Sequence, residues 1–137
     1  MAAQITLVNP NTLGQPLGQY SQLTRIKGAS EYVFIAGQVA SDRAGNIVGA
    51  GDFDAQCVQV FANIEAALRS VGGGCGNVVQ FTTYLVHSQD IPGFMAYRKR
   101  EFPRRFPNGA YPPNTLLMID RLVHEAFLVE VQTVAAL

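Results

Sequence analysis

Short runs of hydrophobic, strand-favouring residues recur along the chain and are separated by stretches rich in Gly, Pro, Asn and Asp. Runs of this length, bounded by turn-forming residues, predict β-strands. The run Tyr32-Val-Phe-Ile-Ala-Gly37 has no charged residue, which predicts a buried central strand. The predicted strands are residues 5–8, 20–27, 32–37, 77–86, 115–119 and 127–134.

Two segments have helical periodicity instead. Asp52 is a candidate N-cap for a helix over residues 53–71, and the glycine triplet at residues 72–74 is expected to end it. A second helix is predicted over residues 90–102, and Pro103 is expected to end it or to begin a new turn. The hydrophobic residues that form one stripe along the first helix are Cys57, Phe61, Ile64, Leu68 and Val71.

This order of elements predicts an α+β fold, in which two helices pack on one face of a mixed β-sheet. The last two strands are expected to pair with each other through the link at residues 120–126. The strands are hydrophobic on both faces, so helices on one side would leave a hydrophobic face open. Large exposed hydrophobic patches mark association sites, and we therefore expect an oligomer rather than a monomer.

One carboxylate, Glu130, stands within the last predicted strand. Strand alternation places it on the same face as Leu128 and Gln132, opposite to Val129 and Val131. A charge on a mostly hydrophobic face costs free energy unless it is paired, exposed or used in function. Two hypotheses remain open: Glu130 forms a structural pair with a backbone group or an arginine at a subunit interface, or it positions a water molecule in a cleft.

Composition narrows the classes of function. The 137 residues suit one domain, residues 1–137, and ten basic against ten acidic residues give a net charge of zero. The whole molecule therefore does not attract nucleic acid or an anionic membrane. No signal peptide or membrane-length hydrophobic run is visible, which predicts a cytoplasmic protein with reduced thiols.

Neither a cofactor nor a metal site is predicted. Cys57 and Cys75 are eighteen positions apart and form no metal-binding pair, and His87 and His124 are isolated. Cys57 falls on the hydrophobic stripe of the first helix and is expected in the core.

Five of the ten basic residues lie between Arg98 and Arg105. A solvated helix face is the simplest interpretation. Two alternatives are a patch for the phosphate backbone of RNA and an inward-facing Arg98 that serves as a substrate-binding cation. Aromatic residues that could stack on bases are sparse near this run, so nucleic acid is not expected as a partner.

Several short motifs appear in an order that resembles the YjgF/RidA family, the reactive-intermediate deaminases. This family is also known as endoribonuclease L-PSP-like or as the translation-inhibitor group. The resemblance covers most of the chain. The residues that carry it are Gly18-Gln-Tyr20, Phe34-Ile-Ala-Gly-Gln38, Gly45, Val71-Gly72, Asn77-Val-Val79, Thr82-Thr83, Asp90-Ile91, Phe94 and Leu128-Val-Glu-Val131.

The resemblance implies a chorismate-mutase-like α+β fold and a homotrimer whose sheets form a central β-barrel. It also implies clefts between adjacent subunits, in which active members hydrolyse enamines or imines to 2-oxo acids and ammonia. Glu130 matches the glutamate that orients the water, and Tyr20 matches the tyrosine of the Gly-x-Tyr stretch. Gly37 and Val39 match the backbone and the hydrophobic wall of the cleft.

The chain departs from the deaminating members at one important point. Those members carry an Arg-x-Cys pair, and counting back from Glu130 without gaps places Thr115 and Leu117 at these positions. No other side chain supplies the planar fork of an arginine. Thr115 is either an ordinary strand residue or a weak hydrogen-bond donor to a ligand. We therefore predict little or no deamination of 2-iminobutyrate.

Three functions follow from these observations. The first is binding of a small carbonyl or carboxylate metabolite in clefts between subunits, with hydrolysis of an enamine, an imine or a related intermediate. The second is a non-catalytic module that senses a ligand or stabilises proteins. The third is RNA binding or endoribonuclease activity through the Arg98–Arg105 run.

Overall fold

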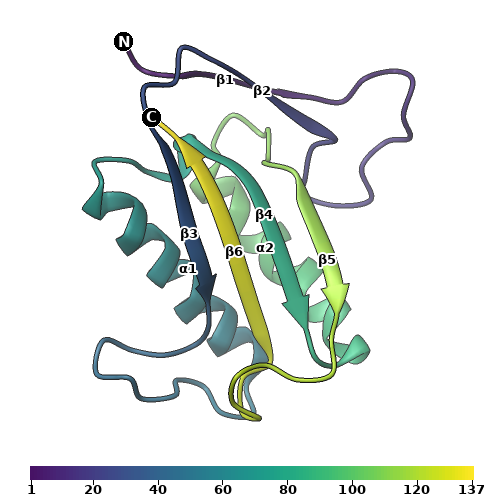
Figure 1. Ribbon diagram of the computed structural model, residues 1–137. Helices are drawn as coiled ribbons and strands as arrows, with labels where there is room; N and C mark the ends of the chain where they lie inside the picture. Colours follow the sequence, from purple (N-terminus) through teal and green to yellow (C-terminus); the bar gives the residue numbers. More distant parts are fainter.

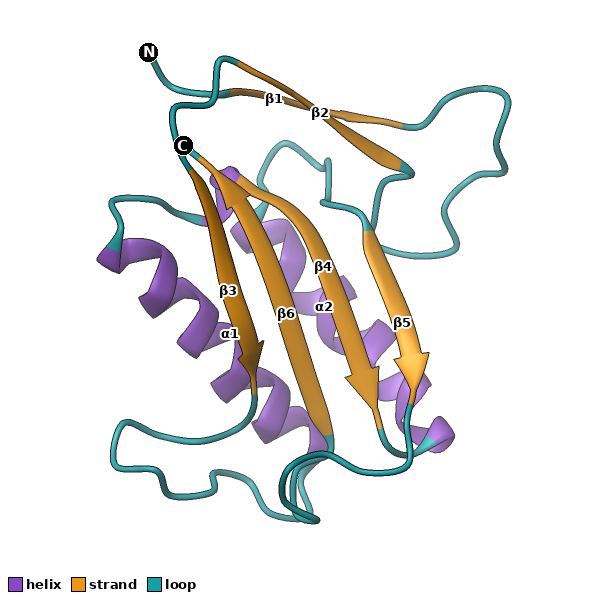
Figure 2. Ribbon diagram, in the orientation of Figure 1, coloured by secondary structure: helices purple, strands orange, loops and turns teal.

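Two helices cover one face of a four-stranded sheet in the computed structural model, which describes residues 1–137 (Figure 1). The strand order is β3-β6-β4-β5, and a separate two-stranded sheet, β1-β2, crosses one end of the large sheet (Figure 2). Two short 3-10 helices, η1 (Cys75–Asn77) and η2 (Ser88–Asp90), flank β4. The main elements are β1 (Gln4–Val8), β2 (Leu23–Lys27), β3 (Tyr32–Gln38), α1 (Phe53–Ser70), β4 (Val78–Leu85), α2 (Ile91–Arg105), β5 (Asn114–Met118) and β6 (Val129–Ala136).

The α+β prediction is confirmed. α1 connects β3 to β4, and α2 connects β4 to β5 as the crossover of a parallel pair. β6 lies between β3 and β4 and is antiparallel to both. Both crossovers pass on the same side of the sheet, which is why both helices cover the same face.

The predicted pairing of the last two strands is wrong. β4 lies between β5 and β6, and it pairs with β5 in parallel and with β6 in antiparallel orientation. The crossover through α2 sets this order, because a strand that returns after a helix can run parallel to the strand before that helix. The link from β5 to β6 therefore passes over the end of β4 instead of forming a tight turn.

Two further expectations need correction. β3 is an edge strand, not a central one, and its Phe34 side chain is 77% exposed. A strand that is hydrophobic on both faces resembles a central strand in sequence even when one of its faces is left open. Pro103 does not end α2, which continues to Arg105. It lies in the last turn, and the Phe106 N–H still donates to the Phe102 carbonyl.

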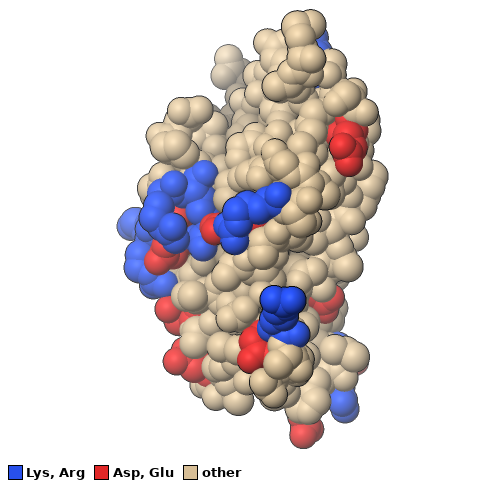
Figure 3. Space-filling model, turned by 90° about the vertical axis from the view of Figure 1, so that its left-hand side faces the viewer, with Lys and Arg blue, Asp and Glu red and all other residues tan.

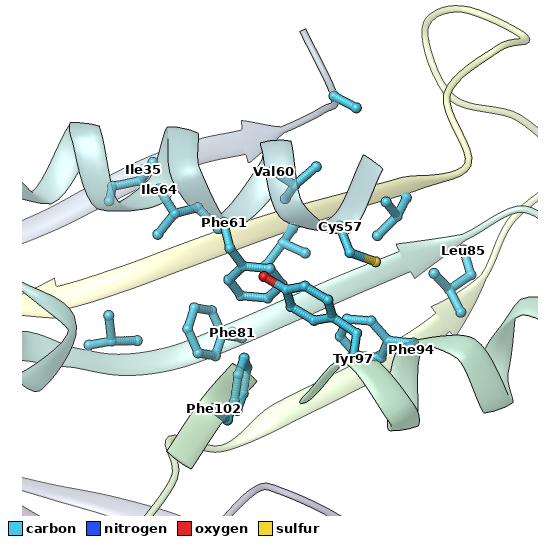
Figure 4. Packing of buried hydrophobic residues seen from close by; sticks show 14 of the residues in the cluster. Ile35, Cys57, Val60, Phe61, Ile64, Phe81, Leu85, Phe94, Tyr97 and Phe102 are labelled. Atoms are coloured by element: carbon cyan, nitrogen blue, oxygen red, sulfur yellow. The ribbon is translucent and has the colours of Figure 1, made fainter. Parts of the chain in front are cut away.

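The core lies between the helices and the sheet and is rich in aromatic side chains (Figure 4). The Phe61 ring is at its centre, stacked on Tyr97 at a centroid distance of 5.3 Å and edge-on to Phe81 and Phe102. Cys57 is fully buried, as predicted from the stripe on α1.

The opposite face of the sheet is open. Tyr32 and Phe34 on β3 are 55% and 77% exposed, and Leu117 on β5 is 42% exposed. A hydrophobic surface of this kind on a sheet fits the expectation that the protein associates with further subunits. Neither helix has the length and hydrophobicity needed to cross a membrane.

Candidate functional site

Glu130 lies on the open face of the sheet, near the start of β6. Its neighbours Val129 and Val131 are fully buried against the helices, so strand alternation directs Glu130 to the other side. In the adjacent strand Tyr84 pairs with Glu130, and Leu117 on β5 pairs in turn with Tyr84. The predicted face of Glu130 is therefore correct.

Gly37 lies directly against this carboxylate. A Cβ atom added at Gly37 would come within 2.0 Å of Oε1 of Glu130, closer than real contacts allow. The register of β3 against β6 shifts between Ile35 and Gln38, at the position of Gly37. A glycine at such an irregularity allows another group to approach the backbone closely.

The two residues share a cavity of about 390 Å³ at this end of the open face. Its wall is completed by hydrophobic and polar side chains from β4, β6 and the link between β5 and β6. Arg121 and Glu130 are its only charged members. The lining residues are Gly37, Tyr84, Ile119, Arg121, Leu122, Val123, Glu130 and Gln132.

Glu130 has no partner within the subunit. Its carboxylate accepts no hydrogen bond and forms no ion pair, although the side chain is only half-exposed. The carboxylates that do accept hydrogen bonds from arginines are Asp54, Glu65 and Glu101, all on the helices. A structural pair for Glu130 would therefore have to come from another subunit.

Thr115 and Leu117 share the open face with Glu130 but do not line its cavity. Thr115 pairs with Thr82, which in turn pairs with Gln132, so it lies one row further along the sheet. Val39 also lies outside the cavity: its side chain packs against the core and its carbonyl accepts a hydrogen bond from Asn63 Nδ2.

Tyr20 and Arg98 form a second cluster. Arg98 is 3% exposed, packs on the Phe94 ring at 4.6 Å and has a long hydrogen bond of 3.4 Å to the carbonyl of Gln19. Its Nε atom has no partner, and burial lowers the pKa of Arg98 to about 10. Arg98 does turn inward, as one hypothesis suggested, but α2 places it on the helix side of the sheet, away from Glu130.

The rest of the basic run is mostly paired. Arg100 donates to Asp54 and Glu101, Arg104 donates to Glu101, and Arg105 pairs with Glu65. On the face shown in Figure 3 the basic side chains gather mainly at the left, and acidic side chains lie among and beside them. These pairs hold the pKa of the Glu101 carboxyl below its usual value, chiefly through the bonds from Arg104 and Arg100.

Gln56 holds the link between β5 and β6 in place. It is fully buried at the start of α1, and its Nε2 donates to the carbonyls of Gly49 and Ala126. Its Oε1 accepts from the backbone N–H of Leu128, two residues before Glu130. One side chain thus fixes the backbone that leads into β6.

The sequence analysis missed Arg121, Tyr84 and Gln56. Arg121 is the basic residue nearest to Glu130 along the chain, and this proximity was a usable signal. Nothing in the sequence distinguishes Gln56 from an ordinary polar helix residue. No three His, Cys, Asp or Glu side chains are grouped so that they could hold a metal ion.

Residues 11–137 match the family profile described as Endoribonuclease L-PSP. The RutC family protein of Synechocystis sp. is 32% identical over 123 residues, which cover 89% of this chain and 88% of that protein. The fold is similar to that of YyfB from Yersinia pestis, a protein of unknown function in the conserved Rid family. That comparison gives a TM-score of 0.85 and 28% identity, and it covers 97% of this chain and 98% of YyfB. The chain belongs to the YjgF/RidA family.

TdcF from E. coli, whose crystal structure contains bound serine, has a similar fold with a TM-score of 0.69. The two chains are 19% identical, and the match covers 96% of this chain and 98% of TdcF. At this identity the similarity concerns the fold.

Proposed function

We propose that this protein binds a small metabolite with a carbonyl or carboxylate group in the Glu130 cavity and hydrolyses a C=N bond there. The observation that carries this proposal is the Glu130 carboxylate, which lies unpaired against Gly37 in a cavity of about 390 Å³. A carboxylate without a partner is free to accept a hydrogen bond from a ligand or from a water molecule.

The chemistry requires one base and one water molecule. Glu130 accepts a proton from the water molecule while the water oxygen attacks the imine carbon. The proton then passes from Glu130 to the nitrogen, and the product is a carbinolamine. Glu130 then carries the hydroxyl proton of the carbinolamine to its nitrogen, the C–N bond breaks, ammonia leaves, and the carbon becomes a carbonyl. Tyr84 and Leu122 form part of the wall that holds the substrate beside Glu130.

A homotrimer with clefts between adjacent subunits completes the proposal. The exposed hydrophobic side chains of Phe34 and Leu117 support it, because they lie on the same open face as Glu130. Tyr20, Thr115 and Arg98 lie away from the Glu130 cavity within one subunit, so they would reach substrate only across such an interface. The cytoplasm remains the expected location.

One comparison is consistent with a small ligand. TdcF, which shares the fold, was crystallised with bound serine, a molecule that fits a cavity of this size. The family includes proteins described as Rid and as endoribonucleases. For this chain, the pairing of Arg100, Arg104 and Arg105 with acids argues against a phosphate-backbone patch.

The second candidate function is ligand sensing without turnover. Thr115 stands at the position of the family arginine, and a threonine hydroxyl binds a substrate carboxylate more weakly than a guanidinium does. This substitution favours ligand sensing. Binding of a carboxylate ligand without any hydrolysis would support this candidate.

Glu130→Gln tests the proposal, with Glu31→Gln as the matched control at an exposed position on the opposite end of the sheet. Turnover of 2-iminobutyrate made in situ would be followed by ammonia release, and 2-oxobutyrate binding by calorimetry. We expect slow turnover that falls by about a hundredfold or more in Glu130→Gln and not in Glu31→Gln, with binding retained in both. Equal turnover in Glu130→Gln and the unmodified protein would contradict the role of Glu130.

A further inference from the structure

Arg121 occupies a fixed position at the rim of the Glu130 cavity. It follows β5 directly, between Ile119, whose N–H donates to the Leu85 carbonyl, and Leu122, which is 7% exposed. Further along, Gln56 holds Ala126 and Leu128. The backbone of the link that carries Arg121 is thus held at both ends and in the middle, while the Arg121 side chain itself is exposed.

The guanidinium of Arg121 has no acidic partner. Its one hydrogen bond within the subunit runs from Nε to the carbonyl of Leu122, at 3.3 Å, which leaves the terminal nitrogens free. Glu130 is also unpaired, and no ion pair joins the two residues. Two opposite charges therefore line one cavity without neutralising each other.

Two other acids lie near Arg121. Asp120 and Glu125 line a neighbouring cavity of about 180 Å³ together with His87, and Arg121 and Leu122 contribute to the walls of both cavities. Neither acid forms an ion pair with Arg121. The nearby carboxylates thus leave the guanidinium available to a ligand in the Glu130 cavity.

We propose that Arg121 binds the carboxylate of the substrate in the Glu130 cavity, in place of the arginine that this chain lacks on β5. This assignment rests on the proposed function and names the residue that would make the site specific for acids. An arginine fork binds a carboxylate through two parallel hydrogen bonds. Glu130, which lines the same cavity, then faces the nitrogen end of the same molecule.

The arrangement also explains how a chain with Thr115 at the position of the family arginine can still bind an acid. Thr115 carries no charge and lies outside the cavity, and Arg98 lies on the helix side of the sheet. Arg121 is the one cationic side chain that lines the cavity. Arg121 binds the substrate carboxylate from the link after β5, whereas the family arginine would bind it from β5 itself.

The test compares a charged ligand with its uncharged counterpart. Calorimetry would measure the Kd of 2-oxobutyrate and of 2-oxobutyramide for the unmodified protein, Arg121→Gln, Arg121→Lys and the control Arg25→Gln. Arg25 is exposed on β2, in the separate two-stranded sheet and away from the Glu130 cavity. Unfolding midpoints and sedimentation of each variant would verify that fold and assembly are intact.

We expect Arg121→Gln to weaken 2-oxobutyrate binding at least about tenfold, with 2-oxobutyramide unchanged. The Kd of 2-oxobutyrate for Arg121→Lys should lie between those of the unmodified protein and Arg121→Gln, because lysine keeps the charge and loses the planar guanidinium. Arg25→Gln should match the unmodified protein. Binding of 2-oxobutyrate to Arg121→Gln within about twofold of the unmodified protein overturns the role of Arg121 and leaves the proposed function standing. Absence of binding of both ligands to the unmodified protein, together with absence of turnover, overturns both.

Discussion

The backbone of Gly37 and the carboxylate of Glu130 are in direct contact, so close that an added methyl group would lie 2.0 Å from Oε1. Gly37→Ala must therefore displace the Glu130 side chain, and we expect 2-oxobutyrate binding and any turnover to fall about tenfold or more. Because the added methyl group would also lie 2.7 Å from Cδ and 2.8 Å from Cγ, the whole Glu130 side chain must turn, and we expect the free energy of unfolding to fall by roughly 1 kcal/mol.

Gly14→Ala is the matched control, because nothing lies within 4 Å of a Cβ atom added there. Calorimetry and urea unfolding would measure both variants. If Gly37→Ala binds the ligand as well as Gly14→Ala does, the close contact has no functional role.

We expect subunits to associate through the open face of the sheet. Phe34 is 77% exposed, and a glutamate there would place a charge in the proposed interface. We expect the unmodified protein to sediment as a trimer of 14.8 kDa subunits and Phe34→Glu to sediment as a monomer. Val58→Glu, at a 48% exposed position on the outer side of α1, should remain trimeric. A monomeric unmodified protein would refute the trimer.

The hydrogen bonds of Gln56 should contribute to the stability of the fold. Gln56→Leu removes the partners of two backbone carbonyls and one N–H, and each such group left unsatisfied when buried costs roughly 1–3 kcal/mol. We expect the free energy of unfolding in urea to fall by more than about 2 kcal/mol. Gln89→Leu, at an exposed position, should stay within about 0.5 kcal/mol. Equal stability of both variants would show that Gln56 does not hold the link.

The buried cation Arg98 lacks an acidic partner, and its Nε atom is unsatisfied. Arg98→Met keeps most of the side-chain volume and removes the charge, so we expect an unchanged or higher free energy of unfolding. Loss of 2-oxobutyrate binding in this variant, with the fold intact, would instead support the predicted substrate-binding role of Arg98. Urea unfolding and calorimetry on one preparation would distinguish a buried cation that costs stability from a residue that binds substrate.

The two thiols should respond differently to pH. Burial, with a smaller contribution from Glu65, raises the pKa of Cys75, whereas burial raises that of Cys57 to about 12. A raised pKa lowers the thiolate fraction at a given pH, so alkylation of Cys75 by iodoacetamide should still be accelerating at pH 9. Cys57 is fully buried and should react only after unfolding. Peptide mass spectrometry at pH 7, 8 and 9 would measure both rates, and a plateau for Cys75 below pH 8 would contradict this prediction.

Periodicity was sufficient to locate most elements of this fold and to place Glu130 on the open face. The stripe of Phe61 and Leu68 on α1 and the alternation around Glu130 are local signals, and the structure follows them. Strand order is not local: it depends on the crossover through α2, and this is why β5 and β6 were wrongly expected to pair. Arg121 lies in a non-periodic link, so its position depended on the tertiary contacts of Gln56 and Leu122.

The position of β4 between β5 and β6 has a consequence for biosynthesis. Glu130 and Arg121 reach the same cavity from opposite sides of β4, and β6 follows the other three strands of the sheet along the chain. A nascent chain whose β6 is still in the ribosome exit tunnel therefore lacks the proposed ligand-binding site, even when both helices have already formed. Under the proposed function, a ligand stabilises only chains in which β6 has joined the sheet, and it gives no help to earlier folding intermediates.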